Sequence, residues 1–215
     1  MKHPWFVIHR QQDVERMPLV EDLKKVIPDI HIFSGLDGSQ FQFMPRLHPE
    51  EYKPVSLPVM GCAMSHLTIL RKCYKLGLEQ VGIFEDDAVL KGDISGCLEM
   101  DMKCDIYYLG LSNMLKGTIS FDPEDRYTTD NGMILYTQFN VKRSYGAFGY
   151  IVNRKAMEAI LNTFTNCLSE GFFYPYDHLL NKAIQDYGLK AKTPMKPLVD
   201  FKRGLFSSLS NRIRY

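Results

Sequence analysis

Short apolar runs alternate along the chain with longer segments of helical periodicity. The runs of strand length are 5–9, 30–34, 80–84, 105–111 and 147–152. Apolar residues recur at three- and four-residue spacing over 17–27, 61–77, 154–164 and 176–187. Strands that alternate with amphipathic helices predict βαβ units, and therefore an α/β domain built on a largely parallel sheet.

Three segments lack this pattern. Residues 41–58 carry four prolines and little periodicity, so we expect a long surface loop there. Residues 113–140 are ambiguous between strand and turn. Residues 191–215 mix lysine and arginine with proline and serine, which indicates a basic tail after a single domain over residues 1–190.

Composition and charge narrow the class of protein. The chain has 215 residues, 45% hydrophobic and 24% charged, which is ordinary globular composition. A net charge of +1 excludes the broad positive field of a dedicated nucleic-acid binder. No apolar stretch approaches the ~18 residues that span a bilayer, and the N-terminal segment turns polar too early for a signal peptide. Five scattered cysteines without a C-x-x-C pair favour reduced thiols, so we expect a cytoplasmic protein without a transmembrane segment.

An acidic triplet, Glu85-Asp86-Asp87, directly follows the apolar run 80–84. Ligands gather at the carboxyl ends of strands in such sheets. Three adjacent carboxylates repel one another and call for a compensating cation, and all-oxygen ligation favours Mg²⁺ or Mn²⁺. Because side chains alternate along a strand, we expect Glu85 and Asp87 on one side and Asp86 on the other. A solvated acidic turn that caps the next segment is the alternative.

Two other segments carry candidate chemistry at predicted helix starts. Ser65 and His66 lie in the expected first turn of the helix that begins near Gly61, where free N–H groups suit a phosphate or hydroxyl ligand. Each also has a purely structural interpretation. Ser65 would be a hydroxyl at a helix start, and His66 would be a buried, hydrogen-bonded polar residue. Asp177 opens the helix over 176–187 and is either its N-cap or a general base.

Phosphate and hydrolase signatures give little further support. Arg10, Asp13 and Arg16 follow the first strand and either contact a nucleotide or form a solvated loop. The sequence contains no G-x-G-x-x-G and no G-x-x-x-x-G-K-[ST] phosphate cradle. It also contains no G-x-S-x-G nucleophile elbow.

Seven sequence blocks occur in a fixed order. They are FVIHRQQDVERM (6–17), FSGLDG (33–38), MGCAMSHLTILRKC (60–73), VGIFEDDAVL (81–90), DIYYLG (105–110), YGAFGYIVNRKAMEAIL (145–161) and YPYDHLL (174–180). In this order they resemble glycosyltransferase family 25, the group with lipooligosaccharide and collagen galactosyltransferases. His9 departs from the family pattern, which usually has asparagine there, and the basic tail has no counterpart.

The resemblance implies a GT-A type fold, with a Rossmann-like, mixed but mostly parallel sheet flanked by helices. It implies a nucleotide-binding half over about 1–112, an acceptor half over about 113–190, a UDP-sugar donor and Mn²⁺ (or Mg²⁺). Glu85 and Asp87 then correspond to the metal-binding element, and Asp177 to the base of an inverting transfer. The residues implied for the nucleotide sugar are Ile8, His9, Arg10, Arg16, Asp37, Ser65, His66, Asp86, Tyr145, Gly146 and Lys202.

The sequence thus predicts a metal-dependent glycosyltransferase that moves a hexose from a UDP-sugar to a glycan or glycoprotein acceptor. Two alternatives stay open. One is a non-catalytic sugar- or nucleotide-binding module of the same fold. The other is a metal-dependent phosphohydrolase built around Asp86 and Asp87.

Overall fold

A computed structural model describes the chain over residues 3–41, 46–48, 51–111, 119–121, 126–128, 134–136, 138–144, 146–202, 206–207 and 212–213. The main sheet contains β1 (Trp5–His9), β2 (His31–Ser34), β5 (Gln80–Glu85), β7 (Ile106–Tyr108), β8 (Ile119–Phe121), β11 (Gln138–Val141), β12 (Gly149–Asn153) and β13 (Ala191–Pro194). The helices are α1 (Met17–Val26), α2 (Leu57–Lys75), α3 (Ser95–Leu98), α4 (Arg154–Ser169) and α5 (Tyr176–Tyr187), with short 3₁₀ turns η1 (Val14–Arg16) and η2 (Gly38–Gln40).

The eight strands lie in the order β2-β1-β5-β12-β7-β13-β11-β8. Strands β12 and β11 run opposite to the other six, so the sheet is mixed but mostly parallel, as predicted. Four two-stranded pairs complete the set: β3 (Arg46–His48) with β4 (Glu51–Pro54), β6 (Ala88–Leu90) with β14 (Val199–Phe201), β9 (Arg126–Thr128) with β10 (Ile134–Tyr136), and β15 (Phe206–Ser207) with β16 (Arg212–Ile213).

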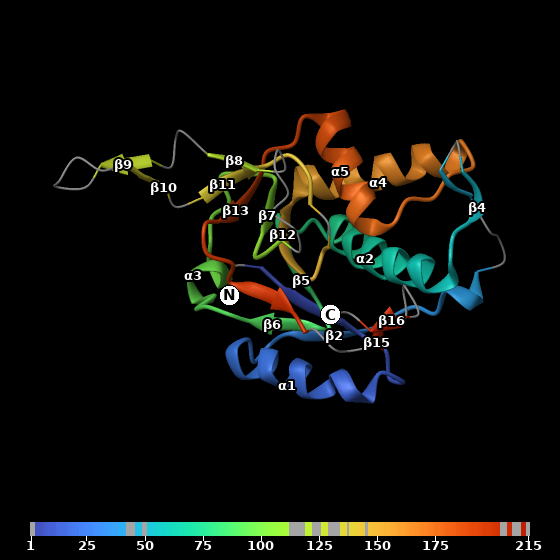
Figure 1. The fold of residues 1–215 in the computed structure, drawn as a ribbon, viewed down its shortest axis with the longest axis horizontal. Coiled ribbons are helices and arrows are strands. Elements are labelled where there is room, and N and C mark those ends of the chain that lie inside the picture. Colours follow the sequence, from blue (N-terminus) through green and yellow to red (C-terminus); the bar gives the residue numbers. More distant parts are fainter. Residues whose placement is uncertain are drawn as a thin grey trace.

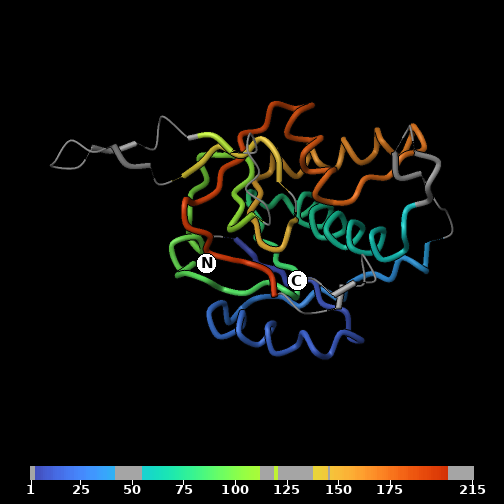
Figure 2. The backbone as a smooth tube through the Cα atoms, viewed as in Figure 1, coloured from blue at the N-terminus to red at the C-terminus, as the bar shows by residue number. Residues whose placement is uncertain are grey.

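Helices cover both faces of the sheet (Figure 1). On β1, Trp5 and Val7 belong to the core cluster that includes the buried residues of α1, whereas Ile8 belongs to the cluster under α2, α4 and α5. On β5, Ile83 and Phe84 divide between the two clusters in the same way. This alternation is the two-residue period of a strand buried on both faces. The later chain, from β12 to α5, returns to pack on α2 (Figure 2).

Three expectations from the sequence are corrected. Helix α2 begins at Leu57 and not near Gly61, because Pro58 fits the first helical turn, where its missing N–H is not needed. Part of the expected loop over 41–58 pairs as β3 and β4. In the expected basic tail, 191–194 forms β13 between β7 and β11, and 199–201 forms β14.

Pairing explains why the start of the expected tail joins the core. The backbone of β13 bonds to strands on both of its edges, and Ala191, Lys192 and Thr193 are buried. The basic residues of this segment made it look like a tail in the sequence. Its pairing with the neighbouring strands, rather than its own hydrophobicity, makes it a strand. No helix in the described ranges is both long and apolar enough to cross a membrane.

A buried histidine lies beside the first strand. His3 is 4% exposed, and its ring packs against Trp5 at 5.1 Å between centroids. Neither ring nitrogen has a hydrogen-bond partner within the part of the chain that the structure describes. Burial lowers the pKa of His3 from 6.5 to about 4, because the charged imidazolium is poorly solvated there.

We predict that His3 makes the protein less stable at acid pH. Between pH 6.5 and about 4 the unfolded chain binds a proton that folded His3 does not, so the free energy of unfolding falls as the pH falls through this window. The resulting loss in the free energy of unfolding is at most about 3 kcal/mol. Urea unfolding at several pH values should show a smaller acid loss for His3→Phe than for the wild type. The exposed His31→Gln should match the wild type, and equal acid loss in His3→Phe would refute the assignment.

Candidate active site

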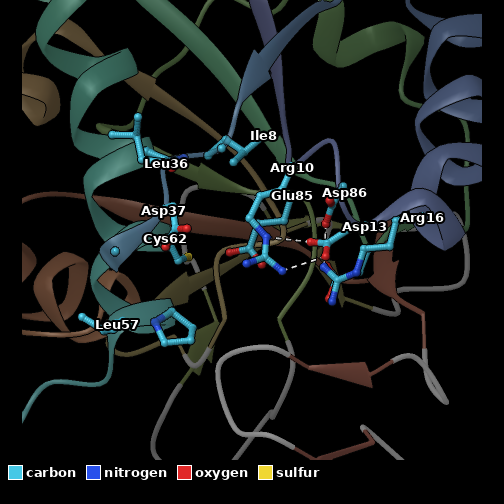
Figure 3. Close-up of a pocket in the computed structure, with 15 residues that line it drawn as sticks. Ile8, Arg10, Asp13, Arg16, Leu36, Asp37, Leu57, Cys62, Glu85 and Asp86 are labelled. Atoms are coloured by element: carbon cyan, nitrogen blue, oxygen red, sulfur yellow. Dashed lines mark hydrogen bonds and ion pairs between the residues drawn. The ribbon is translucent and has the colours of Figure 1, made fainter. Parts of the chain in front are cut away.

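A pocket lies where β1 and β5 end, bordered by the start of α2 (Figure 3). Its volume is about 690 Å³, including space open to solvent. The lining residues are Ile8, Arg10, Asp13, Arg16, Gly35, Leu36, Asp37, Gly38, Leu57, Pro58, Cys62, Ser65, Glu85, Asp86 and Asp87. The pocket is therefore at the carboxyl ends of parallel strands, where α/β sheets place their ligands.

The acidic triplet divides between the two faces of the sheet. Glu85 is the last residue of β5 and faces α2, where its Oε1 lies 3.4 Å from His66 Nε2. Asp86 faces the other way and accepts a hydrogen bond from Arg16 Nη1 at 2.6 Å. The predicted opposite orientation of Glu85 and Asp86 is thus confirmed, whereas Asp87, predicted on the side of Glu85, lies past the end of β5, where strand alternation does not apply. Asp87 lies in the turn before β6, and its carbonyl oxygen accepts from the Lys202 N–H at 2.7 Å.

Asp86 lies at the centre of a buried cluster of charged and polar side chains, formed with His9 and Arg16. His9 Nδ1 lies 3.0 Å from its second carboxylate oxygen, and the side chains of His9, Arg16 and Asp86 are 8%, 11% and 7% exposed. Burial alone would lower the pKa of Arg16, but the carboxylates of Asp86, Asp87 and Asp13 outweigh it and raise that pKa. The protein itself therefore neutralises the middle charge of the triplet.

A second guanidinium lies beside this cluster. Arg10 donates from Nε and Nη2 to the two carboxylate oxygens of Asp13, at 2.8 and 2.7 Å. Figure 3 shows Asp13 between the Arg10 and Arg16 side chains. This fork-to-fork geometry fixes the direction of the Arg10 side chain at the pocket wall.

The opposite wall is the loop 35–38, held against α2 by close backbone contact. A Cβ on Gly61 would clash with the Leu36 carbonyl oxygen and lie 2.9 Å from the Gly38 nitrogen. The Ser65 hydroxyl accepts from the Leu36 N–H at 2.8 Å and donates to the Gly61 carbonyl at 2.7 Å. The hydroxyl of Ser65 therefore positions the loop. Because α2 begins at Leu57, Ser65 and His66 lie in its third turn and not in its first, where the sequence predicted them.

Asp37 caps the short turn that continues this loop. Its carboxylate accepts from the Ser39 N–H at 2.9 Å, and this bond lowers the pKa of Asp37. The side chain lines the pocket while the residue is exposed. Asp37 therefore offers an ionised acceptor at the mouth of the pocket.

His66 connects the pocket to the other half of the fold. It is fully buried, and its Nδ1 lies 2.8 Å from the Tyr150 hydroxyl. Its ring stacks on Tyr176 at 4.1 Å with an interplanar angle of 5°. Tyr150 and Tyr176 are fully buried, which raises both pKa values, so these phenols stay neutral.

Asp177 follows Tyr176 in the first turn of α5. Its carboxylate accepts from the backbone N–H groups of Gly146 at 3.2 Å and His178 at 2.9 Å. Its charge also adds to the burial that raises the pKa of Tyr108. Asp177 and Gly146 are therefore brought together, but neither is among the residues that line the pocket.

Most predicted site residues meet around this pocket. Those that line it are Ile8, Arg10, Arg16, Asp37, Ser65, Glu85, Asp86 and Asp87. His9 and His66 lie behind it, each in contact with an acidic residue of the triplet. Lys202 is exposed, and its backbone adjoins Asp87 through the pairing of β14 with β6. Tyr145 lies outside the described residues.

Cys62 is the pocket residue with a metal-ligating side chain that the sequence analysis did not single out, and Gly35, Leu36, Gly38, Leu57 and Pro58 also line the pocket without having been predicted. Cys62 precedes His66 by four residues on α2, and residues at this spacing share one face of a helix. That spacing could have identified it. The partners of His66, Tyr150 and Tyr176, carry no such signal because they come from distant segments.

The sequence matches the family described as "Glycosyltransferase family 25 (LPS biosynthesis protein)" over residues 3–180. A search of curated proteins finds no match. Among solved structures, A197 from STIV is 12% identical with a TM-score of 0.50, covering 100% of this chain and 95% of that one. This likeness shows a shared fold.

Two further solved structures are more distant. A glycosyltransferase involved in glycosylation of the major capsid of PBCV-1 is 11% identical with a TM-score of 0.41, covering 86% of this chain and 74% of that one. A mutant of Drosophila β1,4-galactosyltransferase 7, in complex with manganese, UDP-Gal and xylobiose, is 10% identical with a TM-score of 0.45, covering 99% and 81%.

The fold is a mixed, mostly parallel sheet flanked by helices, which is the architecture that the GT-A resemblance implied. The family match covers most of the chain, including every residue of the pocket. The protein belongs to glycosyltransferase family 25.

We predict that Gly61→Ala displaces the loop 35–38, because the atoms that its Cβ would meet belong to backbone and cannot rotate away. The expected loss is about 1–3 kcal/mol in the free energy of unfolding. Amide chemical shifts of residues 35–38 should move as well. Gly96→Ala, whose Cβ meets no atom within 4 Å, is the matched control. Unchanged shifts in Gly61→Ala would show that the contact does not hold the loop.

Proposed function

We propose that this protein transfers a hexose from a UDP-sugar to a hydroxyl of a glycan or glycoprotein, with inversion at the anomeric carbon. The observation that carries the proposal is one pocket in which an acidic triplet lies beside two guanidinium groups at the carboxyl ends of β1 and β5. The membership of family 25 supports the transferase class. The donor and the stereochemistry are our inference.

The donor would be held by the half over about 1–112. Arg10 and Arg16 place positive charge at the pocket wall, which suits the diphosphate of a nucleotide sugar. Asp37 places an ionised acceptor opposite, suited to a ribose or sugar hydroxyl. The Lys202 backbone bonds to Asp87 and its side chain is exposed, which supports our assignment of this lysine to the same phosphates.

The donor set of the triplet fits a hard divalent cation. Asp86 is occupied by His9 and Arg16, so Glu85 and Asp87 are the carboxylates that we assign to Mn²⁺ or Mg²⁺. When bound, such a cation acts as a Lewis acid that neutralises charge on the leaving diphosphate.

The acceptor would be activated from the half over about 113–190. Asp177 would accept the proton of the acceptor hydroxyl while the oxygen of that hydroxyl forms a bond to the anomeric carbon. The bond from the anomeric carbon to the diphosphate breaks at the same time, and its electron pair stays on the phosphate oxygen. The Gly146 N–H fixes one carboxylate oxygen at 3.2 Å. The stacked pair His66–Tyr176 connects this base to Glu85 in the donor pocket.

We predict that Asp87→Ala lowers UDP affinity at saturating Mn²⁺ at least about tenfold, while UDP affinity without metal stays the same. Calorimetric titration with UDP, with and without Mn²⁺, measures the difference, and circular dichroism verifies the fold. Asp101→Ala removes an exposed carboxylate away from the pocket and serves as control. Normal metal-dependent affinity in Asp87→Ala would contradict the assignment.

We predict that Asp177→Asn keeps metal-dependent UDP binding but lowers transfer about 10²–10⁴-fold, because the amide cannot accept the acceptor's proton. Transfer from radiolabelled UDP-sugars, with slow donor hydrolysis as a second readout, measures the loss. Asp186→Asn, on the same helix and paired with Lys182, is the matched control. Equal turnover in the wild type and Asp177→Asn would remove Asp177 as the base.

The same preparations separate the proposal from its alternatives. A transferase binds UDP with metal and slowly hydrolyses the donor sugar. A binding module binds without hydrolysis, and a phosphohydrolase releases inorganic phosphate.

A further inference from the structure

Three different ligand types meet at the inner end of the pocket. Cys62 and His66 lie one helical turn apart on α2, and Glu85 faces them from the end of β5. One ligand atom from each, a thiol sulfur, an imidazole nitrogen and a carboxylate oxygen, lies within 4.8 Å of the others. No other group of this kind occurs within the ranges that the structure describes.

Hydrogen bonds around His66 decide which ring nitrogen faces this group. The Tyr150 hydroxyl donates to the Tyr176 hydroxyl at 2.8 Å, so its oxygen accepts from His66 Nδ1 at 2.8 Å. In the neutral ring, Nδ1 then carries the hydrogen and Nε2 carries the lone pair. The stacking on Tyr176 fixes the ring plane. A partner on the distal nitrogen is how proteins orient a metal-ligating histidine.

The lone pair of Nε2 faces the carboxylate of Glu85, whose Oε1 lies 3.4 Å away. In this tautomer the two atoms are held together only by a shared positive charge, either a proton on Nε2 or a metal ion between them. His66 is fully buried, so water does not reduce the repulsion when neither is present. Cys62 is partly exposed and lines the pocket, which gives an ion a route of entry.

We propose that Cys62 Sγ, His66 Nε2 and Glu85 bind a thiophilic divalent cation of the zinc class, with a fourth position open to the pocket. Thiolate and imidazole ligands favour Zn²⁺, whereas Mg²⁺ and Mn²⁺ favour oxygen. Binding releases the Cys62 thiol proton to solvent as the metal–sulfur bond forms. Three protein ligands with one open position is the arrangement of accessible zinc sites rather than closed structural ones.

Glu85 gives this site a consequence for the donor pocket. The proposed function assigns Glu85 to the oxygen-ligated cation, and one carboxylate cannot serve both ions in the same position. Zinc should therefore compete with Mn²⁺-dependent UDP binding. This consequence rests on the proposed function, whereas the site itself does not.

Cobalt tests the site without any nucleotide. We expect Co²⁺ to bind the wild-type protein at one equivalent with a thiolate-to-cobalt charge-transfer band, and Zn²⁺ to displace it. Cys62→Ala should lose the band. Cys73→Ala, on the same helix, should keep it, since burial raises the pKa of the Cys73 thiol to about 11 and keeps it protonated. A missing band, or an equal band in Cys62→Ala, would overturn the proposal.

A second variant tests the orientation of His66. Tyr150→Phe keeps the buried ring but removes the acceptor for Nδ1–H, and Co²⁺ affinity should fall about tenfold or more. Unchanged affinity would refute the positioning role of Tyr150. In the competition assay, the zinc concentration that halves Mn²⁺-dependent UDP binding should rise at least about tenfold in Cys62→Ala. If cobalt binds through Cys62 but zinc does not compete, the metal site stands and its sharing of Glu85 is wrong.

Discussion

The bond between Arg16 and Asp86 joins the parts of the fold that form the pocket. Asp86 follows β5 and Arg16 ends η1, and His9 at the end of β1 contacts the other carboxylate oxygen. Removing one partner of a buried charge pair typically lowers the free energy of unfolding by about 3–5 kcal/mol, because the remaining charge is left buried without a partner. A hydrophobic replacement of the whole cluster could be as stable. We therefore infer that its role is to fix where β1, β5 and η1 meet.

The remaining geometry follows from this fixed point. With Asp86 directed to Arg16, the alternation of β5 directs Glu85 to α2. The contact of Gly61 with the loop 35–38 then sets the width of the pocket between α2 and the strand ends. The first contact joins a strand end to a 3₁₀ turn through side chains, and the second holds the loop 35–38 against the backbone of α2, so regular elements position both pocket walls.

The sequence was most informative where local pattern determines structure. Period-two alternation predicted that Glu85 and Asp86 diverge, and the apolar runs predicted the strands that carry them. The start of α2 was misplaced because Pro58, which opens the helix, follows three other prolines in a segment without periodicity. Strand β13 was missed because its stability comes from β7 and β11, not from its own residues. The Tyr150–His66 contact joins residues 84 positions apart, a relation that no local pattern contains.

Glu85 stands at the boundary between two kinds of coordination chemistry. Toward Asp87 the pocket offers oxygen ligands, and toward α2 it offers sulfur and nitrogen. Divalent ions of equal charge differ in softness, so a carboxylate shared by the two proposed sites would make their occupancy depend on which metal is available. The depth of His66 and its bond to Tyr150 keep the nitrogen side rigid, while the turn after β5 carries the oxygen side. One strand end can in this way place hard and soft ligands within the same pocket, and the fixed orientation of Asp86 keeps the middle carboxylate out of both sets.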